Sequence, residues 1–542
     1  MQASTSASRH AFHNALRSAL ALPAGWLICT AIALHAAAAA PAHAAPGLPS
    51  TNVAWQAAAI DADVDRAFAQ ARTEKKPLLL YWGATWCPPC NQLKATLFNR
   101  QDFAALSRSF VAVHVDGDRP GAQKLSRRFH VSGYPTVVLF GADGVEITRL
   151  PGEVDAPRVI AVLQLGLAGG RPVKAVLADA LAGKAMAAND WRLLAFYSWE
   201  TDEQQLVPKA DLPATLVRLA VASPAADLET TSRLWLKALA ASDEGQGVKA
   251  DAALRERVQR VLADAAQSRA QMDVLTAGAA DIVRTLEAEN SVGRAPLLAS
   301  FEVALKRLQA DPTLSRGDRL GALYARVELA RIDQAKSAVQ VSLPAALLKD
   351  LREHVASADR SITDGYERQA VITAAAATLG LAGLWADSDA LLKSNLDKSH
   401  APYYLMSQLG SNARKQGRNE EALAWFGQAF DKSEGPSTRL QWGEGYLSAL
   451  VDLAPQGSAR IEKTAASLLA EAARDGAAFE GRSVRSLQRV GSKLMAWSAD
   501  GKEAPALRRL QAQLDAVCLK VDAAEGQRAA CQALLKPANK KT

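Results

Sequence analysis

The chain has 542 residues, of which 49% are apolar and 22% charged, and its formal net charge is +7. At roughly 150 residues per domain, this length predicts about three or four structural units. The positive excess is mild, and no run of lysine and arginine carries interleaved aromatics, so we expect no nucleic-acid partner. Aromatic residues make up only 6% of the chain while alanine is abundant, which favours close-packed helices over sheets.

Residues 1–44 have the pattern of an export signal. Arg9 and Arg17 supply positive charge, an alanine-rich apolar stretch follows, and residues 42–44 (Ala-His-Ala) place small side chains before a cleavage site. The signal peptide therefore predicts a mature protein in the periplasm. An uncleaved membrane anchor is the alternative, because the apolar stretch is longer than about 20 residues.

Between residues 53 and 170 the pattern alternates between helices and strands. Helical spacing of apolar residues predicts helices over 61–76, 88–98, 122–131 and 155–170, the last of them capped by Asp155. Apolar or alternating runs predict strands over 78–84 and 110–116, and two strands within 135–150 that are joined by a turn. The expected order is αβαβαββα, which is typical of an α/β domain.

The segment GATWCPPCNQLK, residues 83–94, carries the candidate chemistry. A helix that begins at Pro88 places Cys87 at its N-terminus, where unpaired N–H groups and the helix dipole favour a thiolate. Cys87 is therefore the expected catalytic nucleophile. Cys90 lies one turn further along on the same side, so it can close a disulfide with Cys87 and resolve a mixed disulfide with a substrate.

Two other interpretations of this CxxC motif stay open. A metal site needs four ligands, and one such motif supplies only two, with His114 and His130 as the further candidates. A purely structural disulfide is the other interpretation, although Trp86 and the prolines that open the helix suit an exposed redox site better. We expect no metal and no cofactor.

A strand, the CPPC motif at a helix start and Gly-Tyr-Pro-Thr at residues 133–136 together resemble the thioredoxin superfamily. The stretch from residue 75 to residue 99 is also similar to the thioredoxin-like domain at the end of the bacterial transmembrane disulfide reductase, and the resemblance covers about residues 53–170. The resemblance implies a thioredoxin fold and a cis peptide bond before Pro135. It also implies a substrate-binding groove at Trp86, Tyr134 and Pro135, in which an extended segment pairs as an added strand.

One position departs from the thioredoxin pattern. Thioredoxins usually carry a buried aspartate six residues before the first cysteine, and here that position is Tyr81. The proton acceptor for Cys90 is therefore open, with Glu74 and Asp116 as its neighbours in sequence. The Pro-Pro dipeptide between the cysteines removes N–H donors, so the reduction potential does not follow from the sequence.

From residue 171 to residue 542, strand-like runs stop and helical periodicity continues, which predicts an all-α solenoid of helical hairpins. Residues 409–430 resemble one tetratricopeptide repeat, a helical hairpin of about 34 residues. The positions that carry this resemblance are Leu409, Gly410, Gly417, Ala422, Phe426 and Ala429. A generic helical bundle is the alternative. Solenoids mostly serve as interaction surfaces, so this tetratricopeptide-like region is expected to bind protein partners.

Cys518 and Cys531 form a second candidate pair. After residue 44 the chain has an even number of cysteines, which invites pairing in an oxidising compartment. On one continuous helix these two would lie about 20 Å apart, so a turn near Gly526 is needed to let them form a structural disulfide. A second redox pair, or a substrate of the first pair, is the alternative.

The sequence therefore predicts an exported thiol–disulfide oxidoreductase that reduces disulfides in other proteins. Its expected partners are protein substrates with cysteines or disulfides, and a membrane electron donor is a further candidate. The alternative is a non-enzymatic scaffold or adaptor with a redox-sensing thioredoxin-like head, because the helical region is much longer than the redox domain.

Overall fold

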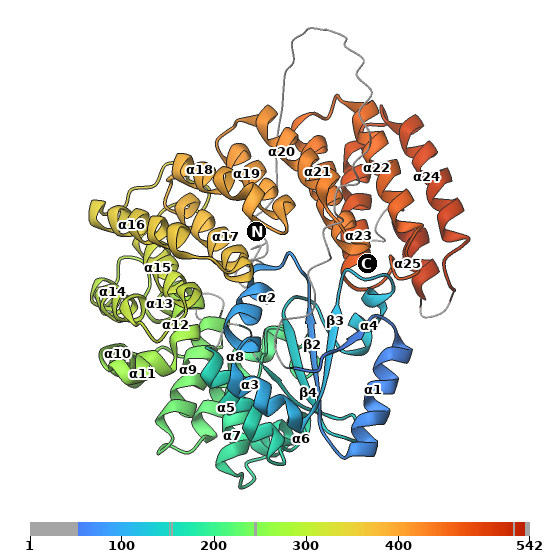
Figure 1. The fold of residues 1–542 in the computed structure, drawn as a ribbon. Coiled ribbons are helices and arrows are strands. Elements are labelled where there is room, and N and C mark those ends of the chain that lie inside the picture. Colours follow the sequence, from blue (N-terminus) through green and yellow to red (C-terminus); the bar gives the residue numbers. More distant parts are fainter. Residues whose placement is uncertain (1–52, 151, 153–154, 243–246, 524–525, 537–542) are drawn as a thin grey trace.

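The computed structural model describes residues 53–150, 152, 155–242, 247–523 and 526–536 (Figure 1). The expected export signal, residues 1–44, lies outside the described residues. Among the described residues, no helix combines the length and the apolar character needed to cross a membrane.

The N-terminal part of the described chain is built on one mixed sheet. Its strands are β1 (Gln56–Ala58), β2 (Leu78–Gly83), β3 (Val111–Asp116), β4 (Thr136–Phe140) and β5 (Glu146–Leu150). The strand order is β1-β3-β2-β4-β5, in which β1, β3 and β2 run parallel while β4 and β5 are antiparallel to their neighbours. This topology carries the thioredoxin fold that the sequence predicts.

Helices cover both faces of this sheet, which explains why β2 is apolar throughout. Leu78, Leu80 and Trp82 face the core that contains α1 (Asp61–Glu74) and α4 (Ala122–Arg128). Leu79 and Tyr81 point to the opposite face. The helices on that face are α2 (Pro88–Leu93), a π-helical segment (Lys94–Phe98), α3 (Gln101–Leu106) and α5 (Ala156–Leu167).

Two elements of this domain were missed by the sequence analysis, and one cap was assigned wrongly. β1 spans only three residues, two of them alanine, and it exists because it pairs with β3. The short helix α3 was also absent from the expected order. Asp155 lies at the N-cap of α5 but makes no capping hydrogen bond, since its carboxylate instead accepts a hydrogen bond from Arg269 at 3.0 Å.

After α5 the described chain is helical, as predicted. The α-helices of this region are α6 (Val173–Leu181), α7 (Ala188–Ala195), α8 (Leu212–Ala222), α9 (Leu228–Ala241), α10 (Ala252–Ala263), α11 (Ala265–Ala270), α12 (Met272–Ala277), α13 (Ala279–Leu286), α14 (Arg294–Ala310), α15 (Arg316–Ala330), α16 (Ala345–Ser361), α17 (Gly365–Leu381), α18 (Trp385–Asn395), α19 (Pro402–Lys415), α20 (Asn419–Lys432), α21 (Pro436–Leu453), α22 (Ser458–Ala472), α23 (Gly481–Trp497), α24 (Ala504–Cys518) and α25 (Gln527–Ala533).

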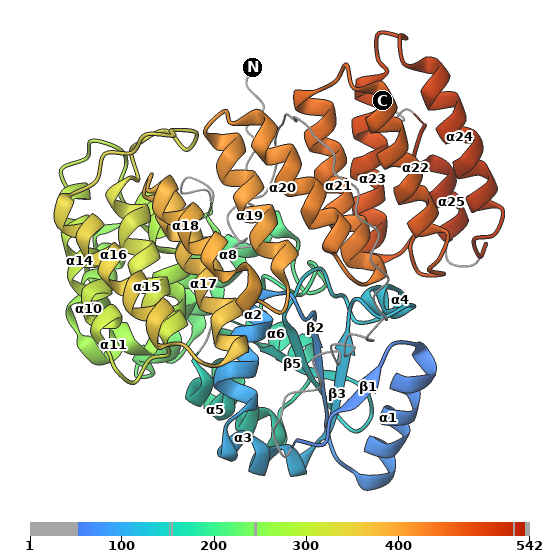
Figure 2. The same cartoon turned by 45° about the horizontal axis from the view of Figure 1, so that its top comes forward.

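These helices form an arc around the α/β domain (Figures 1 and 2). The arc begins beside the sheet at α5 and α6, passes over the end of α2 at α17, and returns to the domain at α23, which packs on α4. The sheet shares one core with the helices from α5 to α15 and the other with α16, α17 and α19. The helical region is therefore packed against the domain along much of its length.

The helical hairpin α19–α20 contains the segment that resembles a tetratricopeptide repeat. Gly410 lies so close to Phe426 that an added Cβ would be 2.9 Å from its ring. Gly417 in the connecting turn has a φ of 69°, a conformation that favours glycine. The small and large residues of this segment thus bring two helices into close contact, while its membership of that repeat family stays a prediction.

Candidate redox site

The two cysteines lie where β2 passes into α2. Cys87 is the N-cap residue of α2, and Pro88 and Pro89 occupy the first helical turn, as predicted. The two cysteine sulfurs are joined in a disulfide, with the Cα atoms 5.2 Å apart. The side-chain amide of Asn91 donates to the backbone oxygens of Thr85 and Cys87, at 2.8 Å each, and so holds the loop before the helix.

The second loop at this site is the one before β4. The peptide bond between Tyr134 and Pro135 is cis. The Tyr134 ring lies 6.2 Å from the ring of Trp86, and its hydroxyl accepts a hydrogen bond from Gln123 at 2.8 Å. The fold thus brings Trp86 and the Tyr134–Pro135 loop together, although they are distant in sequence.

Trp86 is held in place by an acidic residue that the sequence analysis did not single out. Its indole N–H donates to the carboxylate of Asp118 at 2.7 Å. Burial and the nearby carboxylate of Asp116 raise the pKa of Asp118 to about 6. Asp118 lies two residues after β3, at the same edge of the sheet as the disulfide, and this is the sequence signal that could have identified it.

Tyr81, at the position where thioredoxins usually carry an acid, is a core residue. It is fully buried, its ring stacks on His114 with centroids 4.9 Å apart, and burial raises the pKa of its hydroxyl. Glu74 lies at the exposed end of α1 and pairs with Lys76 at 2.9 Å. Asp116 ends β3, and burial raises its pKa. Of the two candidate acids, only Asp116 lies in this buried environment.

Lys94 is a buried base that the sequence analysis missed. It follows Cys90 by four residues, about one helical turn further along at the start of the π-helical segment, and it is only 4% exposed. Burial lowers the pKa of Lys94 to about 8, and the nearby Asp116 partly offsets this shift. Its ammonium lies 5.1 Å from the centre of the Tyr366 ring in α17. The i, i+4 spacing from Cys90 was the signal available in the sequence.

The two histidines considered as metal ligands lie in different surroundings. His114 is packed between Tyr81 and Trp55, and burial lowers its pKa to about 3. His130 follows α4, and its backbone oxygen accepts a hydrogen bond from Arg149 at 2.7 Å. Within the part of the chain that the structure describes, no three His, Cys, Asp or Glu side chains are grouped as a metal site.

Side chains from the helical region cover the disulfide. Cys87 and Cys90 are both 0% exposed, and Trp86 is 1% exposed. The Trp86 ring is 6.0 Å from that of Tyr404 in α19 and 5.8 Å from that of Trp442 in α21. These partners are more than 300 residues away in sequence, so local patterns carried no signal for them. The expectation of an exposed redox site was therefore wrong for this arrangement.

Comparison with known proteins agrees with this geometry. Residues 64–166 match the family model of the thioredoxin-like domain. The thioredoxin-like protein slr0233 of Synechocystis is 31% identical over 90 residues, which make up 17% of this chain and 81% of that protein. The chain belongs to the thioredoxin-like family.

Two further proteins are similar to about a fifth of the chain. They are the thiol:disulfide interchange proteins DsbD 1 and DsbD 2 of Pseudomonas aeruginosa, at 32% identity over 118 residues and 31% over 111 residues. The matches cover 21% and 20% of this chain, and the chain spans about a fifth of the length of both relatives (20% and 19%). A solved structure of a protein from Bacteroides thetaiotaomicron is 26% identical, covers 22% of this chain and 94% of its own, and has a TM-score of 0.19.

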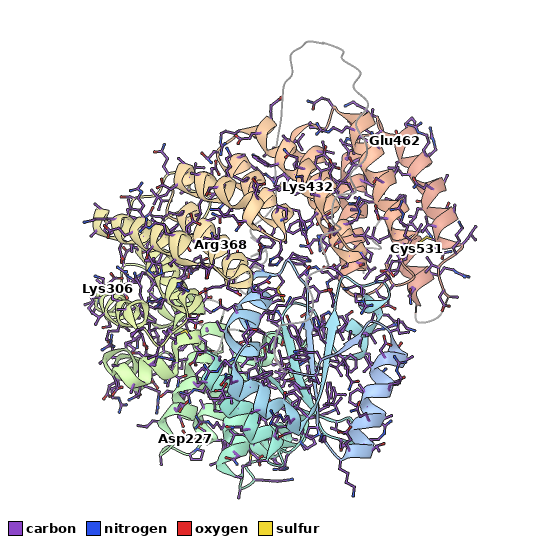
Figure 3. The ribbon with its side chains drawn as sticks, in the orientation of Figure 1. Asp227, Lys306, Arg368, Lys432, Glu462 and Cys531 are labelled. Atoms are coloured by element: carbon purple, nitrogen blue, oxygen red, sulfur yellow. A yellow bond between two sulfur atoms is a disulfide. The ribbon has the colours of Figure 1, made fainter. Side chains whose placement is uncertain are left out.

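The second cysteine pair lies at the far end of the helical arc. Cys518 ends α24 and Cys531 lies in α25, and the two are joined in a disulfide with Cα atoms 5.6 Å apart. Figure 3 labels Cys531 at this end of the arc. Gly526, directly before α25, has a φ of 81°. Both cysteines are buried in the core of the last helices, so the pair lies apart from the redox site.

Proposed function

We propose that the protein is an exported thiol–disulfide oxidoreductase that reduces disulfides of other proteins in the periplasm. The observation that carries this proposal is the Cys87–Cys90 pair at the N-terminus of α2, beside the Tyr134–Pro135 loop of a thioredoxin-like domain. The similarity to proteins called thiol:disulfide interchange proteins supports the class of reaction. The reductive direction rests on the resemblance to the thioredoxin-like domain of the bacterial transmembrane disulfide reductase.

The reaction needs both cysteines in the reduced form. The Cys87 thiolate attacks one sulfur of a substrate disulfide, which forms a mixed disulfide and releases the other substrate sulfur as a thiolate. The Cys90 thiolate then attacks the Cys87 sulfur, which releases the second substrate thiol and closes the Cys87–Cys90 disulfide. Two electrons pass to the substrate, and a dithiol donor, for which a membrane protein is the candidate, returns them.

The position of Cys87 suits the role of nucleophile. As the N-cap residue it lies at the positive end of the helix dipole. Pro88 and Pro89 carry no N–H group, and the Cys90 N–H points at the Cys87 sulfur with an N–S distance of 3.3 Å. Trp86, Tyr134 and Pro135 would form the surface that receives the substrate segment.

Reduction of insulin by the full-length protein in the presence of a dithiol donor tests this proposal. We expect the wild type to accelerate precipitation of the insulin chains and the Cys87→Ala variant to fall to the uncatalysed rate. Refolding of a reduced disulfide protein tests the opposite direction. Wild-type rates no higher than those of Cys87→Ala in both assays would overturn the proposal.

A second candidate function is favoured by the burial of the disulfide. A scaffold or adaptor whose thioredoxin-like head senses redox state would not need open access to many substrates. Trapping with Cys90→Ser separates the two, because this variant cannot resolve a mixed disulfide. An enzyme should accumulate mixed disulfides with many proteins, whereas an adaptor should accumulate them with one or none. N-terminal sequencing of the exported protein tests cleavage after residue 44.

A further inference from the structure

The surface next to the disulfide is already occupied by the helical region. In α23, Arg482 lies over both Trp86 and Tyr134, with its guanidinium carbon 4.7 Å and 5.0 Å from the two ring centres. Arg485 of the same helix donates to the backbone oxygen of Ser132 at 3.0 Å. A substrate segment cannot pair with this loop while α23 lies there, because both would need the same volume.

The helical region also occupies the surface on the other side of the disulfide. The Gln369 side-chain amide, in α17, donates to the backbone oxygen of Trp86 at 3.4 Å. The His400 ring nitrogen, just before α19, is 3.0 Å from the backbone oxygen of Thr85. The backbone on the N-terminal side of Cys87 is therefore hydrogen-bonded to the helical region at two successive residues.

Two glycines allow the helical region to approach this closely. A Cβ added to Gly435 would lie 2.7 Å from the Asp118 Cβ, and one added to Gly481 would lie 2.2 Å from the Ser126 Oγ. Both glycines have positive φ, 84° and 48°, which other residues rarely adopt. The N-terminal ends of α21 and α23 are thus fitted to the domain surface.

Polar contacts surround the aromatic centre of this interface. Arg127 of α4 pairs with Glu480 at 2.8 Å, and the backbone N–H of Arg482 donates to the Gln123 side chain at 2.8 Å. On the far side, the Gln92 amide donates to Ser315 at 2.7 Å. An apolar centre with a hydrogen-bonded polar rim is the anatomy of an interface between separate proteins.

We infer that the helical region is an intramolecular lid on the redox site, and this inference rests on the proposed function. A thiolate must reach a sulfur to exchange, and Cys87 and Cys90 are 0% exposed. Exchange then occurs only from an open form, in which the inner ends of α17, α19, α21 and α23 have moved off the domain. The observed rate is the intrinsic rate multiplied by the open fraction, so a protein that binds the uncovered helices would switch the enzyme on.

Reduction of Cys87–Cys90 by dithiothreitol in the full-length protein tests this inference. The dithiol closes into its cyclic disulfide as the protein disulfide becomes two thiols, and timed alkylation with mass spectrometry reports the site. Arg127→Glu and Glu480→Arg each place like charges across the lid contact. Because the Arg127 side chain is 46% exposed, we expect the disulfide of each variant to be reduced about fivefold faster than that of the wild type. The double variant restores an opposite-charge pair and should return to within about twofold of the wild-type rate.

Arg352→Glu is the matched control, because it reverses an arginine paired with Asp387 at 2.7 Å within the helical region. It should leave the rate unchanged. Arg482→Ala, which removes the contact with Trp86, is an independent variant if a charge reversal fails to fold in a melting scan. If Cys87–Cys90 were reduced at the wild-type rate in every folded variant of the lid contact, the inference of a lid would be overturned. Dithiothreitol reports access whether or not the protein reduces insulin, so failure of the lid and failure of the proposed function are distinguishable.

Discussion

The thioredoxin-like domain and the helical region contribute to the redox site in different ways. The domain supplies the reacting atoms from a stretch of four residues, Cys87 to Cys90, at the junction of β2 and α2. The helical region supplies the surroundings of those atoms from helices far apart in sequence, with Tyr404 in α19, Trp442 in α21 and Arg482 in α23 all at Trp86. Reactivity in this molecule is thus local in sequence, whereas access to the disulfide depends on long-range packing.

The two disulfides also differ in how the fold buries them. Cys87–Cys90 and Cys518–Cys531 are both buried, so burial by itself does not separate the proposed redox disulfide from the proposed structural one. They differ in what buries them. The first shares its core with helices that are distant from it in sequence, among them α16, α17 and α19, whereas the second lies inside the core of the helices that carry it. In the proposed lid, the first disulfide is uncovered without unfolding of the element that carries it.

The largest expected effect comes from truncation of the aromatic centre of the lid. Trp442 is 7% exposed and contacts Trp86, Tyr403 and Tyr404. Trp442→Ala should destabilise the protein by about 3–5 kcal/mol and leave a cavity over Trp86. We therefore expect a lower melting temperature and much faster reduction of Cys87–Cys90 by dithiothreitol, measured by calorimetry and by timed alkylation.

Phe301→Ala provides the control for lost stability alone. Phe301 is 0% exposed in α14, within the core that contains α5 to α15, and its truncation should cost a similar free energy. It should lower the melting temperature without uncovering the disulfide. If Cys87–Cys90 were reduced equally faster in both variants, access to the disulfide would depend on the stability of the whole protein. The disulfide would then not be covered by a lid that opens locally.

An intermediate effect is expected for the second disulfide. Its cysteines are separated by 13 residues in sequence, and a closed loop of this length contributes about 3 kcal/mol. Replacement of both Cys518 and Cys531 by serine should speed hydrogen exchange in α24 and α25 and leave insulin reduction unchanged. Unchanged hydrogen exchange in α24 and α25 would argue against a structural disulfide. Loss of insulin reduction would argue for a second redox pair.

The sequence was most informative where structure depends on neighbours in the chain. The start of α2 at Pro88 follows from the position preferences of proline, and the continuous apolar run of β2 follows from burial on both faces. β1 could not be found this way, because Gln56–Ala58 has little strand propensity and depends on pairing with β3. Asp155 has a side chain that suits a helix cap, but its carboxylate accepts a hydrogen bond from Arg269, which is distant in sequence.

The same limit applies to the candidate site. Cys87 and Cys90 were identified because their spacing and helix start are local features. The role of Asp118 as partner of Trp86 depends on the register of β3 beside β2, and the lid depends on the course of the whole helical arc. Glycines such as Gly435 and Gly481 can be seen in the sequence, but what they approach is set only by the tertiary fold.

The smallest expected effect lies at Lys94, where the two regions meet. Its pKa of about 8 is below the ordinary value of 10.5, because burial disfavours the charged form. Between pH 8 and pH 10.5 the unfolded chain binds more protons at this residue than the folded chain does, so wild-type stability rises with pH in this window. Lys94→Met removes the titrating group. We expect the variant to be the more stable protein at pH 7, and its advantage to shrink by about 2 kcal/mol as the pH rises to 10.

Melting temperatures of both proteins at pH 7, 8, 9 and 10 measure this change. Lys306→Met, at an exposed lysine on α14 (Figure 3), controls for the loss of a lysine as such, and its difference from the wild type should stay constant. A constant difference for Lys94→Met as well would mean that Lys94 gains and loses its proton in the folded protein as it does in the unfolded chain. Since the Lys94 ammonium lies over the Tyr366 ring of α17, that result would also mean that the lid does not keep water from this side of the redox helix.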